Sequence, residues 1–229
     1  MASDNATAHM AGNYDRDVRS AIPFYDLFHD ETIGLVRAAK PDVGAWLDTG
    51  CGTGTLIGKA LPLFPKTTFL LADPSEKMLD QAKARLADAA QGRVQFLATA
   101  GSGELPAHVS VQPDVLTAIQ CHHYLDADGR RAAVKACFDA LAPGGLFVTF
   151  ENIRPLTSKG LKIGLAHWRA FQMTKGRTSE QADAHLKRFD AEYFPITAVE
   201  HLALLRDCGF SAVELFWYSQ MQAGFYAIK

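Results

Sequence analysis

The glycine-rich stretch at residues 46–55, Trp-Leu-Asp-Thr-Gly-Cys-Gly-Thr-Gly-Thr, constrains the fold of this chain more than any other feature. It follows a short apolar run typical of a strand and leads into residues 56–61, where the pattern favours a helix. Glycines in a strand-to-helix turn let the backbone approach a ligand closely, and the free N–H groups of the helix start favour a polar or anionic group. The stretch therefore predicts a nucleotide-type binding turn.

The spacing of the glycines indicates which kind of nucleotide. A dinucleotide fingerprint requires Gly-x-Gly-x-x-Gly, and in this chain the third glycine of that pattern would fall on Thr55 or Ile57. The motif present instead is Asp-x-Gly-x-Gly-x-Gly, from residue 48 to residue 54. The spacing therefore excludes the dinucleotide pattern in both registers.

A carboxylate completes the pattern. The apolar run at residues 68–72 predicts a second strand, and Asp73 follows it directly. In a doubly wound sheet the tip of the second strand lies beside the first turn, where a carboxylate can accept hydrogen bonds from both hydroxyls of a ribose. The alternative is a tight turn with an incidental surface aspartate.

These motifs together resemble the class I S-adenosylmethionine-dependent methyltransferases, and the Leu-x-Pro-Gly-Gly turn at residues 141–145 adds to the likeness. The resemblance covers about residues 45–229. It implies an α/β fold with a doubly wound, seven-stranded, mostly parallel sheet that ends in an antiparallel hairpin. The residues favour the same architecture, because short apolar runs alternate with amphipathic stretches from residue 45 onward.

The resemblance implies S-adenosylmethionine as the cofactor and assigns binding residues by position. These are Tyr25, Asp48, Gly50, Cys51, Gly52, Asp73, Pro74, Met78, Thr99, Ala100 and Gln120. Asp48 is expected near the methionine amino group and Asp73 at the ribose. Many relatives place an acid after the third strand for the adenine amino group, whereas this chain has Thr99 and Ala100 there, which leaves that contact to the backbone or to a hydroxyl.

Two histidines after the predicted fourth strand, residues 115–119, are candidates for a catalytic base. His122 and His123 follow the carboxyl end of a strand, where open α/β sheets bind ligands. Methyl transfer from a sulfonium depends mainly on aligning the nucleophile, and a base is needed only for an acceptor that starts protonated. The alternative for each histidine is a loop residue that shapes the pocket. Tyr124 and Glu151 are expected in the substrate site, or else as packing and satisfied polar residues.

Residues 19–25, Arg-Ser-Ala-Ile-Pro-Phe-Tyr, and parts of residues 187–217 are similar to the carboxy-S-adenosylmethionine synthases. In that group a tyrosine touches the cofactor and an arginine binds the carboxylate of the modified cofactor. Tyr25 and Arg188 match these two residues, and we assign Arg19 and Arg188 to the substrate site. The chain departs from the group at Thr53, where the group has serine. The likeness also implies a homodimer in which Arg188 reaches the neighbouring pocket.

Two segments flank or interrupt the predicted core of residues 45–229. Residues 1–44 predict an N-terminal lid or, equally, a helix packed on the sheet edge. Residues 153–196 are rich in basic and aromatic side chains and predict a helical cap over the substrate pocket.

Composition narrows the function classes. The chain has 229 residues, a net charge of −2 and a pI near 6.4, which gives no footprint for nucleic acid. No apolar run approaches the ~18 residues of a membrane span, and no signal-peptide core is present. The four cysteines form no Cys-x-x-Cys pair, which argues against a metal site. We expect a cytoplasmic protein that acts on a small molecule, without a nucleic-acid, membrane or metal partner.

Three functions follow as hypotheses. The first is a methyltransferase for a small-molecule acceptor. The second is an enzyme that makes or uses a carboxylated cofactor, and the third is a protein that binds S-adenosylmethionine without chemistry.

Overall fold

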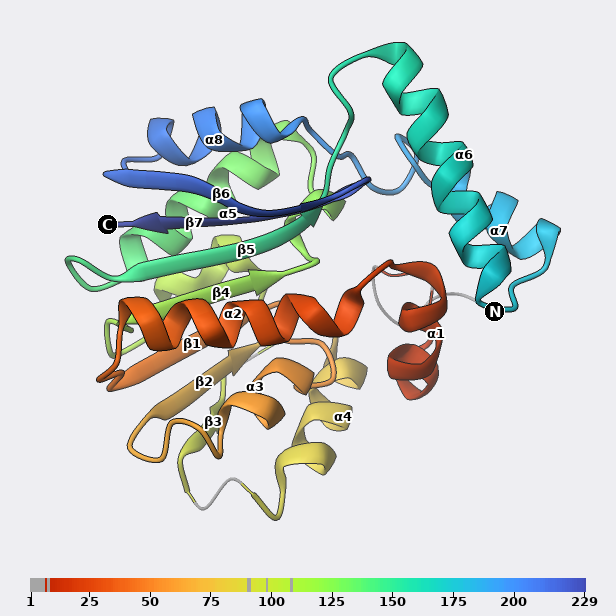
Figure 1. Ribbon diagram of the computed structural model, residues 1–229. Coiled ribbons are helices and arrows are strands. Elements are labelled where there is room, and N and C mark those ends of the chain that lie inside the picture. The colour runs from red at the N-terminus through yellow and green to blue at the C-terminus, as the bar shows by residue number, and fades with distance from the viewer. Residues whose placement is uncertain (1–6, 8, 90–91, 98, 108) are drawn as a thin grey trace.

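The computed structural model describes residues 7, 9–89, 92–97, 99–107 and 109–229. Among them, seven strands form one sheet in the order β3-β2-β1-β4-β5-β7-β6 (Figure 1). The strands are β1 Ala45–Thr49, β2 Thr68–Ala72, β3 Val94–Phe96, β4 Val115–Ile119, β5 Leu146–Asn152, β6 Ala212–Ser219 and β7 Gln222–Ile228. Strands β1 to β5 run parallel, and β7 pairs antiparallel with both β5 and β6. The predicted sheet and its C-terminal hairpin are confirmed.

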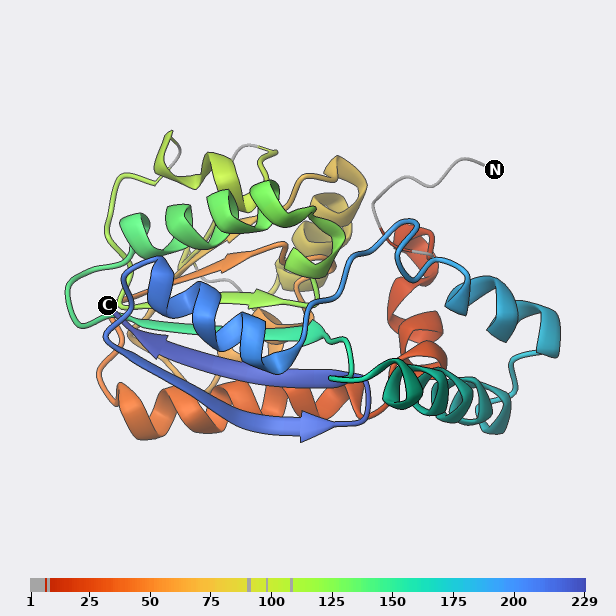
Figure 2. The ribbon, with the colours of Figure 1, turned by 90° about the horizontal axis from the view of Figure 1, so that it is seen from above.

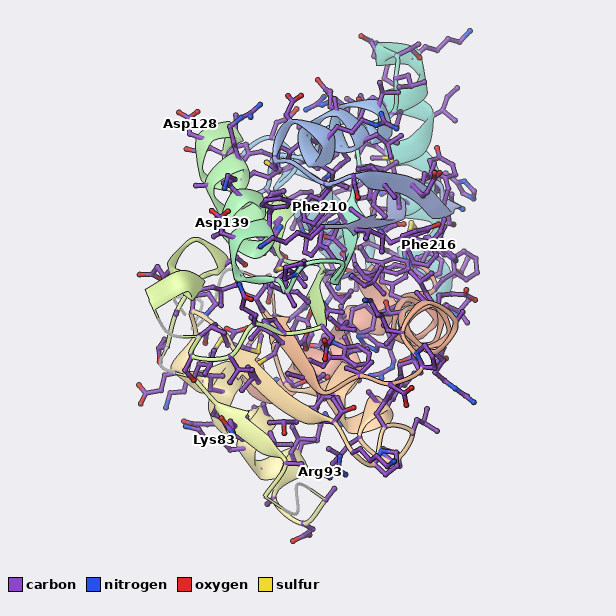
Figure 3. The ribbon with its side chains drawn as sticks, turned by 90° about the vertical axis from the view of Figure 1, so that its left-hand side faces the viewer. Lys83, Arg93, Asp128, Asp139, Phe210 and Phe216 are labelled. Atoms are coloured by element: carbon purple, nitrogen blue, oxygen red, sulfur yellow. The ribbon has the colours of Figure 1, made fainter. Side chains whose placement is uncertain are left out.

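Helices cover both faces of the sheet, which explains why β1 and β5 are buried along their whole length. The helices of this core are α2 Tyr25–Ala39, α3 Thr55–Ala60, α4 Glu76–Leu86, α5 Ala127–Ala140 and α8 Ala198–Asp207. One hydrophobic cluster joins α2, α3 and α4 to the sheet, and a second joins α5 and α8. Phe216 packs against the first cluster and Phe210 belongs to the second, so the two rings mark opposite faces (Figure 3).

In its described part, the N-terminal segment forms two α-helices that lie in different places, and its role as a lid stays a prediction. Helix α2 packs on the sheet face, where Phe28 stacks on Phe150 with ring centroids 4.8 Å apart. The preceding helix, α1 Tyr14–Ala21, instead lies at the edge where the parallel strands end (Figure 1). Helix α2 begins at Tyr25, after Phe24 turns the chain with a φ of 58°.

The predicted cap is helical. It contains α6 Ser158–Thr174 and α7 Ser179–Leu186, which lie beside α1 and away from the sheet (Figures 1 and 2). Trp168 of α6 is buried, and its indole N–H donates to the carbonyl of Ala21 at the end of α1. The cap and α1 therefore form one lobe over the carboxyl ends of the strands.

Short-range signals set several element boundaries. Ser75 caps α4 by accepting from the N–H of Met78. Thr197 and Glu200 form a capping box at the start of α8. The third strand, β3, spans Val94–Phe96, and residue 98 lies outside the described residues. No helix in the described part of the chain is both long and apolar enough to cross a bilayer.

Candidate active site

The turn after β1 has the backbone that its glycines predict. Gly50, Gly52 and Gly54 adopt positive φ angles of 61°, 54° and 74°. A Cβ at Gly50 would stand 2.6 Å from the Cβ of Cys121, so this position also needs glycine for space. A Cβ at Gly52 would meet nothing within 4 Å, so Gly52 borders open space.

Asp73, at the end of β2, is tied to this turn. Its Oδ2 accepts from the N–H of Gly52 at 2.9 Å, and its Oδ1 accepts from the N–H of Ser75 at 2.8 Å. Burial raises the pKa of the Asp73 carboxyl, and the two backbone hydrogen bonds oppose that rise. Each oxygen keeps capacity for another donor, as a bidentate contact to a diol requires.

A cavity of about 280 Å³ opens beside the turn. Its lining includes seven of the predicted site residues: Gly50, Gly52, Asp73, Pro74, Met78, Gln120 and Tyr124. A smaller pocket next to it, which shares Gly50 and Gly52, is lined by the predicted Tyr25, Asp48 and Cys51. The structure thus brings together predicted residues from β1, β2, β4 and α2.

Asp48 is a buried carboxyl at the floor of the smaller pocket. Burial raises its pKa to about 7, although the hydroxyl of Thr117, which donates to Oδ1 at 2.6 Å, opposes that rise. A cationic group in the pocket would favour the ionised form. This suits the amino group of a bound amino acid moiety.

Gln120 is strained and incompletely bonded. It has a φ of 57°, which side chains other than glycine rarely adopt, and its N–H donates to the carbonyl of Phe150 at 2.6 Å. Its side chain is buried, and Nε2 has no hydrogen-bond partner. Strain and an unpartnered donor on a cavity wall are features of a ligand-binding position. Together with the glycine turn and Asp73, they fit an adenosyl cofactor.

The two predicted catalytic histidines are buried outside the cavity. His122 Nε2 lies 2.8 Å from the hydroxyl of Ser102, and burial lowers its pKa. His123 Nδ1 lies 2.6 Å from Oε2 of Glu151. Neither histidine nor Glu151 lines the pockets described above. Their catalytic role stays a prediction, and their placement favours the alternative, in which they shape the loop.

Glu151 is the anchor of that loop. Its carboxylate accepts from the backbone N–H groups of His122 and His123 and from the hydroxyl of Thr149. Burial would raise the pKa of Glu151, but the hydrogen bond and charge of His123 hold it down at about 2. The loop that carries Gln120 and Tyr124 into the cavity is therefore fixed by one buried carboxylate.

A small chamber adjoins the larger cavity and shares Tyr14, Gln120 and Tyr124 with it. The cap supplies the opposite wall through His185, Arg188 and Tyr193. Both ring nitrogens of His185 and the hydroxyl of Tyr193 are buried without a hydrogen-bond partner. Burial lowers the pKa of His185 to about 3, so its ring is neutral at pH 7. Arg188 reaches the pocket of its own chain.

Residues 47–147 match a family model described as "Methyltransferase domain". The chain contains a class I S-adenosylmethionine-dependent methyltransferase domain. The predicted enzyme class and its cofactor, S-adenosylmethionine, are confirmed at this level.

Curated relatives of this methyltransferase-family protein are distant. The carboxy-S-adenosyl-L-methionine synthase of Trichodesmium erythraeum is 26% identical over 205 residues, which cover 88% of this chain and 79% of that one. The synthase of Helicobacter hepaticus is 23% identical over 217 residues, which cover 91% and 87% of the two chains.

Solved structures share the fold. The plantazolicin methyltransferase BamL superposes with a TM-score of 0.68 at 16% identity, covering 95% of this chain and 88% of that one. An O-methyltransferase family protein from Burkholderia thailandensis gives a TM-score of 0.61 at 18% identity. That comparison covers 95% of this chain, which spans only 63% of the Burkholderia protein.

Three further predicted site residues, besides His122, His123 and Glu151, lie apart from the cavity lining. The side chain of Arg19 is half-exposed and makes a bidentate ion pair with Asp26, with both N–O distances at 2.8 Å. Thr99 is exposed, whereas Ala100 is buried and donates its N–H to the carbonyl of Asp73. The assignments of these residues stay predictions.

Thr53, which replaces the serine of the synthase group, keeps a hydroxyl at this position, and that hydroxyl has a hydrogen-bond partner. Thr53 donates to Oδ1 of Asp15 at 2.7 Å, and Arg85 pairs with the other oxygen of Asp15. This contact ties α1 to the glycine turn and brings Tyr14 into the cavity wall. Sequence reasoning missed Tyr14, although the dense aromatics of residues 14–29 were a signal for it.

Proposed function

We propose that this protein transfers the methyl group of S-adenosylmethionine to a small polar acceptor held in the chamber under the cap. The observation that carries the proposal is the shared wall of Gln120, Tyr124 and Tyr14 between the two spaces. An acceptor in the chamber would lie next to a cofactor in the larger cavity. Alignment of the two reactants is the main requirement for displacement at the sulfonium methyl.

Two carboxylates would hold the polar parts of the cofactor, and apolar side chains would contact its adenine. Asp73 would accept the ribose hydroxyls, Asp48 would face the amino group, and Pro74 and Met78 would flank the adenine. The bound cofactor supplies the activated methyl. The protein's own residues bind it, fix its orientation and exclude water.

The acceptor would be recognised by the unpartnered groups of the chamber. The hydroxyl of Tyr193 and the amide of Gln120 can donate, and neutral His185 offers one donor and one acceptor nitrogen. A buried polar group without a partner is unfavourable by about 1–3 kcal/mol, so a ligand that pairs these groups gains affinity. A hydroxyl or carboxyl compound suits this set.

A second function, modification of the cofactor itself, is favoured by the position of Arg188. Its guanidinium lines the same chamber as Tyr124, where a cation would attract a carboxylate. The two curated relatives described above are carboxy-S-adenosyl-L-methionine synthases. In this alternative the chamber holds the carboxylate of a modified cofactor instead of a separate acceptor. A homodimer and a cytoplasmic location remain predictions under either function.

Mass spectrometry separates these functions. The purified protein is incubated with S-adenosylmethionine deuterated at the methyl group and a panel of hydroxy and carboxylic acids. S-adenosylhomocysteine together with a deuterated product supports methyl transfer. A bound cofactor that has gained a carboxylate and kept two of its three deuterium atoms supports the second function, because carboxylation of the methyl carbon replaces one C–D bond. Tight binding of unchanged cofactor with no product across the panel would contradict both.

A further inference from the structure

The cap concentrates positive charge. Residues 152–179 contain no aspartate or glutamate and six basic residues: Arg154, Lys159, Lys162, Arg169, Lys175 and Arg177. Because the whole chain carries a net charge of −2, the remaining residues carry −8. A methyltransferase domain with an acidic body thus presents one basic segment, and α6 forms most of it.

Helix α6 is apolar on two faces. Its inner face packs against α1 through the buried Trp168. On the opposite side, Ile163 is 61% exposed and Met173 is 43% exposed, and Leu156, just before the helix, is 73% exposed. A surface helix with one covered side normally has a single apolar stripe. The second stripe therefore has no partner within the described residues.

Exposed lysines flank this second stripe. Lys159 and Lys162 have no ion-pair partner in the described part of the chain. We use the term outer face of α6 for one set of residues: Leu156, Lys159, Lys162, Ile163 and Met173. Figures 1 and 2 show α6 at the periphery of the molecule, away from the sheet. The outer face is thus open to a partner.

The charged and aliphatic side chains of the outer face favour one class of partner over two others. Two copies of α6 packed on each other would bring like charges together, which is unfavourable. A nucleic acid would leave the exposed Ile163 and Met173 against phosphates. Exposed aliphatic side chains bordered by lysines are instead typical of helices that lie in the interface of an anionic bilayer.

We propose that the outer face of α6 docks on an anionic phospholipid surface. The aliphatic side chains would enter the boundary between headgroups and acyl chains, and the lysines would contact the anionic headgroups. Such docking needs no membrane-spanning segment. It also leaves the cofactor cavity untouched, because no residue of the outer face lines that cavity.

Vesicle co-sedimentation of the 229-residue chain tests the proposal. Vesicles of phosphatidylcholine alone are compared with vesicles that also contain phosphatidylglycerol. We expect binding only to the anionic vesicles, weakened by added salt. The double variant Lys159→Glu/Lys162→Glu should bind about tenfold more weakly or worse. Ile163→Ser/Met173→Ser should also weaken binding while keeping the charge.

The matched control is Lys77→Glu/Lys83→Glu on α4, which makes the same charge change at exposed positions elsewhere; Figure 3 labels Lys83. This control should bind like the unchanged protein. Unaltered thermal unfolding and cofactor affinity would show that the α6 variants fold. Equal binding to both vesicle types, no binding at all, or equal losses in the α6 and α4 variants would overturn the proposal.

Two further outcomes would also overturn it. In the first, the protein sediments as a dimer that Ile163→Asp converts to a monomer, and it ignores vesicles, so a second copy covers the outer face. In the second, it binds the soluble polyanion heparin through the same lysines but not the vesicles.

Discussion

The cofactor cavity and the cap chamber share a wall but are built in different ways. The cavity is formed mainly by backbone groups. These are the glycines with positive φ and the N–H groups of Gly52 and Ser75, which hold Asp73 in place. The chamber rests on side chains from distant segments, and the polar atoms of His185 and Tyr193 in it are unpartnered. Under the proposed function, cofactor binding is thus encoded in the turns of the sheet, whereas acceptor recognition would depend on polar groups that a ligand completes.

The largest expected effect on stability comes from substituting Glu151, which fixes the loop that carries Gln120 and Tyr124 of the shared wall. Glu151→Ala removes the acceptor of two backbone N–H groups and of His123, and we expect unfolding to become easier by about 3–5 kcal/mol. Cofactor affinity should fall as well, because Gln120 and Tyr124 lose their support. Chemical denaturation and calorimetry measure both. A variant that keeps its stability but loses turnover would show instead that Glu151 contacts the substrate.

The cavity itself is tested at Asp73. Asp73→Ala should weaken S-adenosylmethionine binding by about 100-fold, since hydrogen bonds to a charged acceptor contribute about 1.5–3 kcal/mol each. Asp73→Asn should lie between this variant and the unchanged protein. Isothermal calorimetry gives the affinities. Binding within a factor of about three of normal in both variants would remove Asp73 from the ribose site.

Substitutions at Gly50 and Gly52 separate an effect on protein stability from an effect on cofactor binding. Gly50→Ala should lower stability by about 2–3 kcal/mol, because its Cβ would strike Cys121 and its φ is positive. Gly52→Ala faces open space and should lower stability by only about 1 kcal/mol while reducing cofactor affinity. Equal losses of stability in the two variants would contradict the assignment. Cys121→Ala should partly rescue Gly50→Ala.

The raised pKa of Asp48 predicts that both protein stability and cofactor affinity depend on pH. Its pKa of about 7 in the folded protein exceeds the ordinary 3.8, so the folded state holds a proton that the unfolded chain releases. Stability should fall as the pH rises from about 4 through 7. Affinity for the cationic amino group should rise about tenfold between pH 5.5 and 7.5, as the carboxyl ionises. In Asp48→Asn both dependences should flatten; an unchanged pH profile of affinity would exclude the contact.

The smallest effect on stability is expected in the chamber. Tyr193→Phe removes a hydroxyl that has no partner, so stability should be unchanged or higher by up to about 1 kcal/mol. The KM for the acceptor should increase while cofactor affinity stays constant. Thermal unfolding and steady-state kinetics measure these quantities. A clear loss of stability would show that the hydroxyl is used within the folded protein.

The two regions also differ in how well the sequence predicts them. Residues in the turns after β1 and β2, such as Gly52 and Asp73, are local to strands with clear apolar patterns, and the structure brings them together. The chamber depends on how α1, α7 and the loop after β4 meet, and no spacing in the sequence encodes that meeting. His185 and Tyr193 were therefore not singled out, and the environment of His122 and His123 could not be foreseen.

One measurement tests the central claim, that the glycine turn and Asp73 hold an adenosyl sulfonium cofactor. A crystal structure of the protein grown with S-adenosylhomocysteine should show the ribose hydroxyls on Asp73 and the amino acid end beside Asp48. A cavity that stays empty at saturating ligand, or a ribose bound elsewhere with Asp73 free, would contradict the account.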